Sequence, residues 1–190
     1  MIVGLGNPGD CFVGTRHNVG VEVVALLAQR CGQVLRKTSE AALVAEAKVD
    51  ERRVVLAFPQ TFMNKSGESV RLLVRRWNIA GCLERLVVVH DELDLPPGCI
   101  RIKYGGGLAG HNGLISIRTH LRSAEFTRIR IGVGKPSSTG TLSAGTGADY
   151  VLQHPGRADR EMLDDAVARS AEAALALLDE PLDAVMNKFN

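Results

Sequence analysis

The sequence predicts an α/β protein, a single-domain three-layer α/β/α sandwich around a mixed, mostly parallel twisted sheet. Apolar runs of strand length alternate with segments of helical periodicity along most of the chain. The run at 86–89 is apolar without alternation, which is typical of a strand buried on both faces. Segments 41–49 and 52–58 flank a two-residue turn, and this pattern adds an antiparallel hairpin to the sheet.

Length and composition agree with one domain over residues 1–190. A hydrophobic content of 45% argues against disorder in this chain of 190 residues. The net charge of +2 is unevenly spread, because residues 155–190 hold 4 Lys and Arg against 8 Asp and Glu. The remaining 19 basic and 13 acidic residues make the preceding part of the chain basic. A basic body permits a phosphate-bearing partner without requiring one.

The first half of the chain is predicted to alternate strands with two amphipathic helices. The helix at 18–31 carries an apolar face and ends at Gly32, a common stop signal. The helix at 66–78 begins with Ser66-Gly67-Glu68-Ser69. Strands are expected at 1–5, 33–37, 41–49 and 52–58.

The second half continues the same alternation. Strands are expected at 86–89, 99–104 and 128–133, and helices at 112–122 and 157–179. Residues 135–148 are rich in Pro, Ser, Thr and Gly and are predicted to form a mobile connection. The chain then closes with a C-terminal helical segment, 157–190.

The first loop, 4–9, leads to the sequence Thr15-Arg16-His17-Asn18. It places a base, His17, and an amide, Asn7, at the end of a strand, where α/β folds put their sites. Three later loops, 61–64, 90–92 and 105–112, are expected to lie beside this first loop in the folded protein.

These loops carry the groups of a hydrolase. His90 and Asp91 follow a buried strand, and a carboxylate beside an imidazole forms the base-and-orienter pair of many hydrolases. The alternative for this segment is a solvated turn. No Ser or Cys lies in a nucleophile elbow, so water is the expected nucleophile. The amides of Asn7, Asn64 and Asn112 offer donors and acceptors to a peptide group, with turns or helix caps as the alternative.

Two other site types are not supported. The glycines of Gly4-x-Gly6-x-x-Gly9 match the dinucleotide fingerprint, but Pro8 removes an amide donor and the helix begins several residues later. No cofactor is therefore expected. A zinc site from His17, His90 and Asp91 matches no metal-binding spacing, so no metal is expected either.

Three features that the sequence lacks predict the cellular compartment. Cys11, Cys31, Cys82 and Cys99 form no C-x-x-C pair, which predicts buried free thiols in a reducing compartment. No apolar run is long enough to span a bilayer, and the start leaves no room for a signal peptide. A soluble, cytoplasmic protein is expected.

Five motifs together resemble the bacterial peptidyl-tRNA hydrolase family. They read Gly-Leu-Gly-Asn-Pro-Gly, Thr-Arg-His-Asn, Thr-Phe-Met-Asn-Lys-Ser-Gly, His-Asp-Glu-Leu-Asp-Leu-Pro-Pro-Gly and Gly-His-Asn-Gly-Leu. They occur in the family's order and with similar spacing over about residues 1–134, and 128–132 also fits.

The resemblance implies a monomeric enzyme that hydrolyses the ester between a peptide and the terminal ribose of tRNA, and that recognises the acceptor stem and 3′ CCA end. By motif, His17 would be the general base, Asp91 would orient it, and Asn7 would polarise the carbonyl or bind the peptide backbone. The residues expected to bind the peptidyl and nucleotide end, or the tRNA phosphate, are Phe12, Phe62, Met63, Asn64, His111, Asn112, Lys103 and Arg130.

The chain departs from the family pattern at a few positions. Phe12 stands where the family usually has Tyr, so a hydroxyl contact to RNA is lost while stacking is retained. Leu108-Ala109 interrupt the usual glycine-rich loop, and 136–148 differ from the usual connection. The alternative function is a catalytically weak, splicing-factor-like RNA-binding relative, and the intact His17 and Asp91 argue against it.

Overall fold

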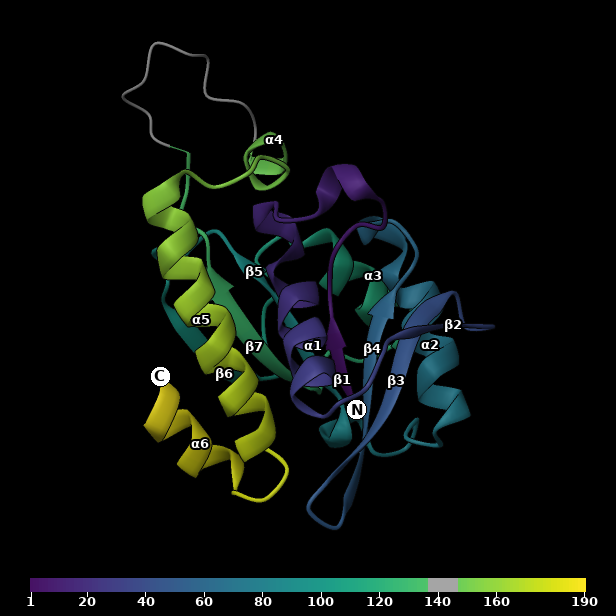
Figure 1. The fold of residues 1–190 in the computed structure, drawn as a ribbon. Coiled ribbons are helices and arrows are strands. Elements are labelled where there is room, and N and C mark those ends of the chain that lie inside the picture. The colour runs from purple at the N-terminus through teal and green to yellow at the C-terminus, as the bar shows by residue number, and fades with distance from the viewer. Residues whose placement is uncertain (137–146) are drawn as a thin grey trace.

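A computed structural model describes residues 1–136 and 147–190 and contains one seven-stranded sheet flanked by helices (Figure 1). The strands are β1 (Ile2–Gly4), β2 (Arg36–Thr38), β3 (Ala42–Val49), β4 (Arg52–Pro59), β5 (Val87–Glu92), β6 (Ile100–Tyr104) and β7 (Thr127–Gly132). The α-helices are α1 (Val19–Arg30), α2 (Ser66–Arg76), α3 (Asn112–Leu121), α4 (Gly147–Val151), α5 (Arg157–Ala176) and α6 (Leu182–Phe189). Short 3-10 turns are η1 (Asp10–Phe12), η2 (Arg16–Asn18), η3 (Met63–Lys65) and η4 (Leu83–Arg85).

The sheet is mixed, with a parallel centre. Its order is β2-β3-β4-β1-β5-β7-β6, and β4, β1, β5 and β7 pair in parallel. The hairpin partner β3 and the edge strand β6 run antiparallel to their neighbours. The predicted fold class is therefore confirmed.

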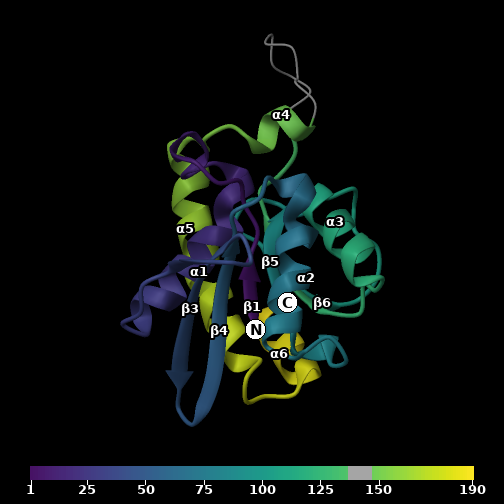
Figure 2. The same ribbon diagram turned by 90° about the vertical axis from the view of Figure 1, so that its right-hand side faces the viewer.

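Two apolar cores explain the unbroken apolar run of β5. Val87 and Val89 face the core under α1, α5 and α6, whereas Val88 faces the core under α2 and α3. Because successive side chains of a strand point to opposite faces, both faces of β5 must be apolar. Figure 2 shows α1 and α5 on one side of the sheet and α2 and α3 on the other, which gives the three layers.

Two glycines bring the start of α1 against the sheet. A Cβ on Gly4 would lie 2.1 Å from the carbonyl oxygen of Gly20, and one on Gly20 would lie 2.3 Å from that of Val89. No side chain fits such distances. The close approach places η2, and with it His17, beside the carboxyl ends of β1 and β5, next to the point where the sheet order switches direction.

Most differences from the sequence prediction lie at element ends. Strand β5 runs on through Glu92 because His90, Asp91 and Glu92 continue the pairing with β7. Helix α4 was not predicted and begins at Gly147, inside the proposed mobile connection 135–148. Residues 137–146 of that connection lie outside the described residues.

The cysteine prediction was half right. All four thiols are free, but Cys11 and Cys82 are exposed and Cys31 and Cys99 are half-buried, so the expected burial was wrong. These residues lie in turns and at element ends, where apolar periodicity carries little information about burial. No helix in the described part of the chain has the length and apolar character needed to cross a membrane.

Candidate active site

A cavity of about 600 Å³ opens at the carboxyl ends of β1 and β5. The structure brings most of the predicted site residues to its walls. Those lining it are Asn7, Phe12, His17, Phe62, Met63, Asn64, Asp91, His111 and Asn112. Only Lys103 and Arg130, among the predicted site residues, lie outside this wall.

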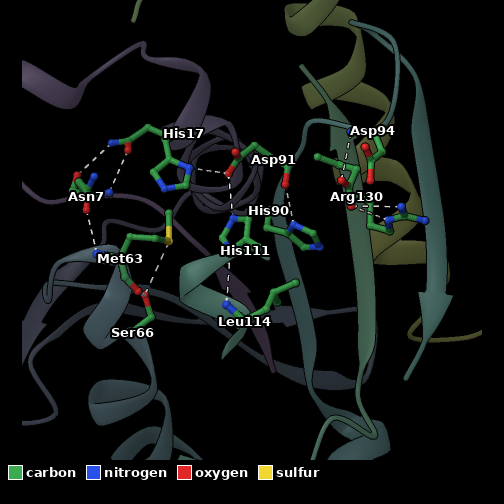
Figure 3. A network of polar contacts seen from close by, with 12 residues as sticks. Asn7, His17, Met63, Ser66, His90, Asp91, Asp94, His111, Leu114 and Arg130 are labelled. Carbon is green, nitrogen blue, oxygen red and sulfur yellow. Dashed lines mark hydrogen bonds and ion pairs between the residues drawn. The ribbon is translucent and has the colours of Figure 1, made fainter. Parts of the chain in front are cut away.

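His17 and Asp91 form the central pair of the cavity (Figure 3). Nδ1 of His17 lies 2.8 Å from Oδ1 of Asp91, and the ionised carboxylate only accepts, so Nδ1 carries the proton. The second ring nitrogen of His17, Nε2, therefore bears the lone pair. The 3-10 turn η2 holds His17 in place, since Asn18 N–H donates to the carbonyl oxygen of Thr15.

A second imidazole reaches the same carboxylate oxygen. Nε2 of His111 lies 3.0 Å from Oδ1 of Asp91. His111 caps helix α3, and its Nδ1 accepts a hydrogen bond from the backbone N–H of Leu114 at 3.3 Å. Because Nδ1 is the acceptor, Nε2 carries a proton and donates to Asp91.

A third imidazole supports the backbone of Asp91. Nδ1 of His90 donates to the carbonyl oxygen of Asp91 at 2.7 Å, and the His90 ring meets the His111 ring edge-on at 4.8 Å between centroids. His90 is 1% exposed, and its Nε2 has no partner among the described residues. Burial, followed by the nearby His111, holds the pKa of His90 well below its usual value, so this ring is neutral.

The imidazole neighbours of Asp91 keep its carboxyl group ionised. Burial alone would raise the pKa of this 3%-exposed carboxyl. The attraction and hydrogen bonds of His111 and His17 outweigh burial and hold the pKa of Asp91 well below its usual range. Asp91 is therefore an ionised carboxylate beside His17 at neutral pH.

Asn7 presents one half of its amide to the cavity. Its Oδ1 accepts from the backbone N–H of Met63 at 2.8 Å, while Asn18 bonds both backbone groups of Asn7 at 2.9 and 3.0 Å. The Nδ2 donor is the side-chain group of Asn7 that remains available to a ligand. Met63 already uses one lone pair of Oδ1, and the expectation that Asn7 offers both a donor and an acceptor to substrate stays a prediction.

The other amides and the aromatic side chains line the rim. Asn64, the second residue of η3, and Asn112, the first residue of α3, are exposed and line the cavity. Phe62 is 58% exposed and Phe12 is half-buried, whereas Met63 is buried. This rim offers both stacking surfaces and amides to a ligand.

Lys103 and Arg130 lie on the neighbouring strands β6 and β7, outside the cavity wall. Arg130 on β7 is half-buried, and its Nη2 lies 3.1 Å from Oε2 of Glu92, a buried residue of the cavity wall. Lys103 on β6 is exposed, in register with Arg128, and makes no ion pair within residues 1–136 and 147–190. The two cations thus differ, because in the described part of the chain Arg130 forms an ion pair and Lys103 does not.

Sequence reasoning missed four contributors to the site. Asn18 holds the backbone of Asn7, His90 supports Asp91, Glu92 pairs with Arg130, and α4 supplies Val151 to the wall. Asn18 and His90 stood inside the quoted motifs, so the motifs were the available signal. The roles of these four groups depend on contacts between segments that are distant in the sequence. The sequence alone therefore does not predict them.

The donor atoms of His17, Asp91 and His111 lie within 4.8 Å of one another, a distance that a metal ion could bridge. Both ring nitrogens already donate their protons to Oδ1 of Asp91. A cation would have to displace both protons, since a metal ligand must offer a lone pair. The geometry is that of a hydrogen-bonded network.

The fold and the site define a hydrolase that activates water with a carboxylate-oriented imidazole. The peptidyl-tRNA hydrolase family model matches residues 1–190. A peptidyl-tRNA hydrolase of Moorella thermoacetica is 43% identical over 191 residues, covering 100% of this chain and 97% of the relative. One of Halalkalibacterium halodurans is 41% identical over 190 residues, covering 100% and 99%.

Solved structures agree with these relatives. The crystal structure of peptidyl-tRNA hydrolase from Acinetobacter baumannii superimposes with a TM-score of 0.89 at 35% identity, covering 100% of this chain and 93% of that one. The chain belongs to the peptidyl-tRNA hydrolase family.

Proposed function

We propose that this protein hydrolyses the ester bond between a peptide, or an N-blocked amino acid, and the 3′-terminal ribose of tRNA. The reaction recycles tRNA from prematurely released peptidyl-tRNA. Relatives that cover the whole chain carry the name of this activity. The observation that carries the proposal is the 2.8 Å bond from His17 to Asp91, which leaves the lone pair of His17 beside a cavity that also holds the Asn7 donor.

The network supports one sequence of steps. Nε2 of His17 takes a proton from water as the water oxygen adds to the ester carbonyl carbon. Asp91 stabilises the imidazolium that forms, and Nδ2 of Asn7 donates to the oxygen on which negative charge develops. The bond from carbon to ribose oxygen then breaks, and the imidazolium returns its proton to that oxygen. The products are a peptide carboxylic acid and a tRNA with a free 3′-terminal hydroxyl.

His111 and His90 keep Asp91 in the orientation that this sequence needs. His111 donates to the same oxygen as His17, and His90 donates to the backbone carbonyl of Asp91. Removing either ring would free Asp91 to rotate and weaken the orientation of His17.

Selectivity against aminoacyl-tRNA is assigned to the amides at the cavity. Peptidyl-tRNA carries a peptide bond where aminoacyl-tRNA carries an ammonium. The donor of Asn7 and the rim amides of Asn64 and Asn112 suit a peptide group, which offers carbonyl oxygens. An ammonium offers no acceptor and would be desolvated in the cavity, and both effects oppose binding.

The tRNA partner would extend over the neighbouring strands. Lys103 and Arg130 on neighbouring strands would contact phosphate, and the aromatic side chains of Phe12 and Phe62 in the cavity wall would stack on the terminal nucleotides. We propose that the enzyme acts as a monomer, because a single chain brings His17, Asp91 and Asn7 to the cavity. Because peptidyl-tRNA arises in translation, the proposed compartment is the cytoplasm. The described residues give no support to a catalytically weak RNA-binding function.

The test is release of the acyl group from N-acetyl-aminoacyl-tRNA, followed beside the unblocked aminoacyl-tRNA. We expect rapid hydrolysis of the blocked ester and slow hydrolysis of the free one, with a ratio of specificity constants of roughly 10⁴. No hydrolysis of the blocked ester would remove the proposed activity. Comparable rates for both esters would leave a hydrolase but contradict the proposed selectivity.

A further inference from the structure

Arg16 is a buried cation directly before His17, and the chemistry proposed above does not use it. It is 6% exposed, and such burial is unusual for an arginine without paired charge. Its Nη1 and Nη2 are bonded, whereas Nε has no partner among the described residues. It begins the 3-10 turn η2 that carries His17. Its side chain points away from the Asp91 network, toward the segment that follows α4.

The guanidinium contacts three places in the segment 150–159, which runs from α4 to the first turn of α5. Nη2 lies 2.9 Å from Oδ2 of Asp159, in the first turn of α5. Nη1 donates to the carbonyl oxygens of His154 at 3.1 Å and Gln153 at 3.4 Å. Cζ lies 4.3 Å from the centre of the Tyr150 ring, a cation–π distance. The backbone N–H of Arg16 adds a bond to the carbonyl oxygen of Gln153 at 3.2 Å.

The segment held by Arg16 forms part of the cavity wall. Helix α4 and the residue after it contribute Val151 and Leu152 to that wall. Figure 1 shows α4 beyond the end of the sheet, apart from the helices that cover its faces. A helix of five residues has no stability of its own, so its position depends on tertiary contacts.

Further bonds support the same docking. Nε2 of His154 donates to the carbonyl oxygen of Val13 at 2.9 Å, and the Tyr150 hydroxyl donates to that of Val133 at 2.9 Å. His154 and Tyr150 each link the segment 150–159 to the rest of the protein by one side-chain hydrogen bond. Arg16 bonds both the turn after α4 and the start of α5, and its cation also lies over a ring of α4 itself.

We propose that Arg16 is the positioning residue that docks α4 against η2 and so sets the apolar wall that receives the acyl part of the substrate. The proposal rests on the proposed function for its kinetic readout. Arg16 acts on substrate binding through α4, and the His17–Asp91 pair performs the chemistry independently of it. Lysine cannot replace Arg16, since an ammonium lacks the planar fork that reaches a carboxylate and two carbonyls together.

The test compares two variants that undo the docking from opposite sides. Arg16→Gln removes the cation, and Tyr150→Leu removes its aromatic partner on α4 while leaving the guanidinium paired to Asp159. For N-acetyl-aminoacyl-tRNA we expect KM to rise at least about fivefold in both, with kcat within about twofold and an unchanged pH profile of kcat. Arg16→Lys should behave as Arg16→Gln.

The matched control is Arg160→Gln. Arg160 lies on α5, next to Asp159, and makes a bidentate pair, at 3.1 and 2.9 Å, with Glu22 of α1. Its other ion pair among the described residues is with Asp164 of α5, not with α4. We expect it to lower stability and leave KM unchanged. A similar rise of KM in this control would overturn the proposal, since general loosening of α5 would then suffice. A fall of kcat with a changed pH profile in Arg16→Gln would also overturn it, because Arg16 would then act through His17.

A second readout is independent of activity. Amide hydrogen exchange at 150–153 should be faster in Arg16→Gln and Tyr150→Leu than in wild type, with exchange in β5 unchanged. Unchanged exchange at 150–153 would contradict the docking role even if KM rose. An inactive wild type would remove the proposed function and leave this measurement to decide the docking. Because Tyr150→Leu also loses the hydroxyl bond to Val133, its effects are compared with those of Tyr150→Phe, which loses that bond and keeps the ring. If Arg16→Gln does not fold, equal effects of Tyr150→Phe and Tyr150→Leu on KM and exchange would overturn the proposal.

Discussion

A single oxygen, Oδ1 of Asp91, accepts hydrogen bonds from two imidazoles. The shared acceptor fixes the rotamer of the carboxylate from two directions and gives each ring a defined tautomer. His17 is left with its lone pair on Nε2, while His111 has its Nδ1 occupied by Leu114. The two rings therefore have different roles although they bond the same atom.

Buried His90 makes stability depend on pH. Burial depresses its pKa in the folded protein, while the unfolded chain takes up a proton near pH ~6.5. Below that value the unfolded state binds more protons, so stability falls as pH falls, by up to about 1.4 kcal/mol per pH unit. His90→Asn keeps a donor for the Asp91 carbonyl without a titrating ring. We expect the slope of unfolding free energy between pH ~6.5 and ~5 to become shallower in this variant.

Denaturant unfolding at several pH values measures that slope in both proteins. The comparison uses slopes, so the stability that His90→Asn loses through smaller volume does not affect it. Equal slopes would mean that His90 titrates alike in the folded and unfolded chains.

Asn7 provides the residue-scale test of selectivity. In Asn7→Asp one carboxylate oxygen would keep the bond to the Met63 N–H, and the other would replace the Nδ2 donor in the cavity. A carboxylate attracts an ammonium and cannot donate to a carbonyl. We expect the ratio of specificity constants, blocked over unblocked aminoacyl-tRNA, to fall by at least about tenfold. An unchanged ratio would move discrimination to other groups and leave the hydrolase assignment intact.

At the scale of elements, the loop before α3 is held by Leu108. This side chain is 8% exposed and belongs to the core cluster that contains Met63 and Leu114. Ala109 after it adopts a positive φ of 47°, a conformation that costs a residue with a Cβ roughly 1–2 kcal/mol. The loop is thus anchored at Leu108, beside the strained residue Ala109, which stands two positions before His111.

We expect Leu108→Ala to lower the free energy of unfolding by about 2–3 kcal/mol, because it empties a buried apolar site. The matched control is Ile115→Ala on α3, where the side chain is 36% exposed and the expected loss is below about 1 kcal/mol. Chemical denaturation of both variants gives the comparison. Equal losses would show that Leu108 does not anchor the loop.

Elements were predictable where periodicity is strong. The 86–89 run, the hairpin and the long helix of α5 follow from side-chain pattern, and the observed ends differ by a few residues. Helix α4 escaped prediction because five residues in a small-residue segment carry no periodic signal. The site residues were found as motifs, but the Asp91 network and the occupied Oδ1 of Asn7 depend on contacts between distant loops.

At the scale of the whole molecule, charge distribution bears on the tRNA partner. The chain has a basic body and an acidic C-terminal segment, and Lys103 is an exposed cation without an acidic partner in the described residues. If Lys103 and Arg130 each contact a phosphate, KM for tRNA esters should rise roughly tenfold between about 50 and 200 mM salt. Lys103→Gln should flatten this dependence without breaking an ion pair.

An N-acetyl-aminoacyl ester of adenosine, which lacks the tRNA body, is the control substrate for that titration. Its KM should change little with salt. Equal salt slopes for both esters would show that the basic body does not bind the tRNA backbone.

The most direct test of the account is the turnover of His17→Ala on N-acetyl-aminoacyl-tRNA. The variant removes the lone pair of Nε2 and leaves Asp91 bonded to His111, so the cavity and the fold should persist. We expect kcat to fall by roughly 10²–10⁴-fold with little change in KM, the loss expected for a general base. A variant that keeps more than about a tenth of wild-type kcat would contradict the assignment of His17 as the base that activates water.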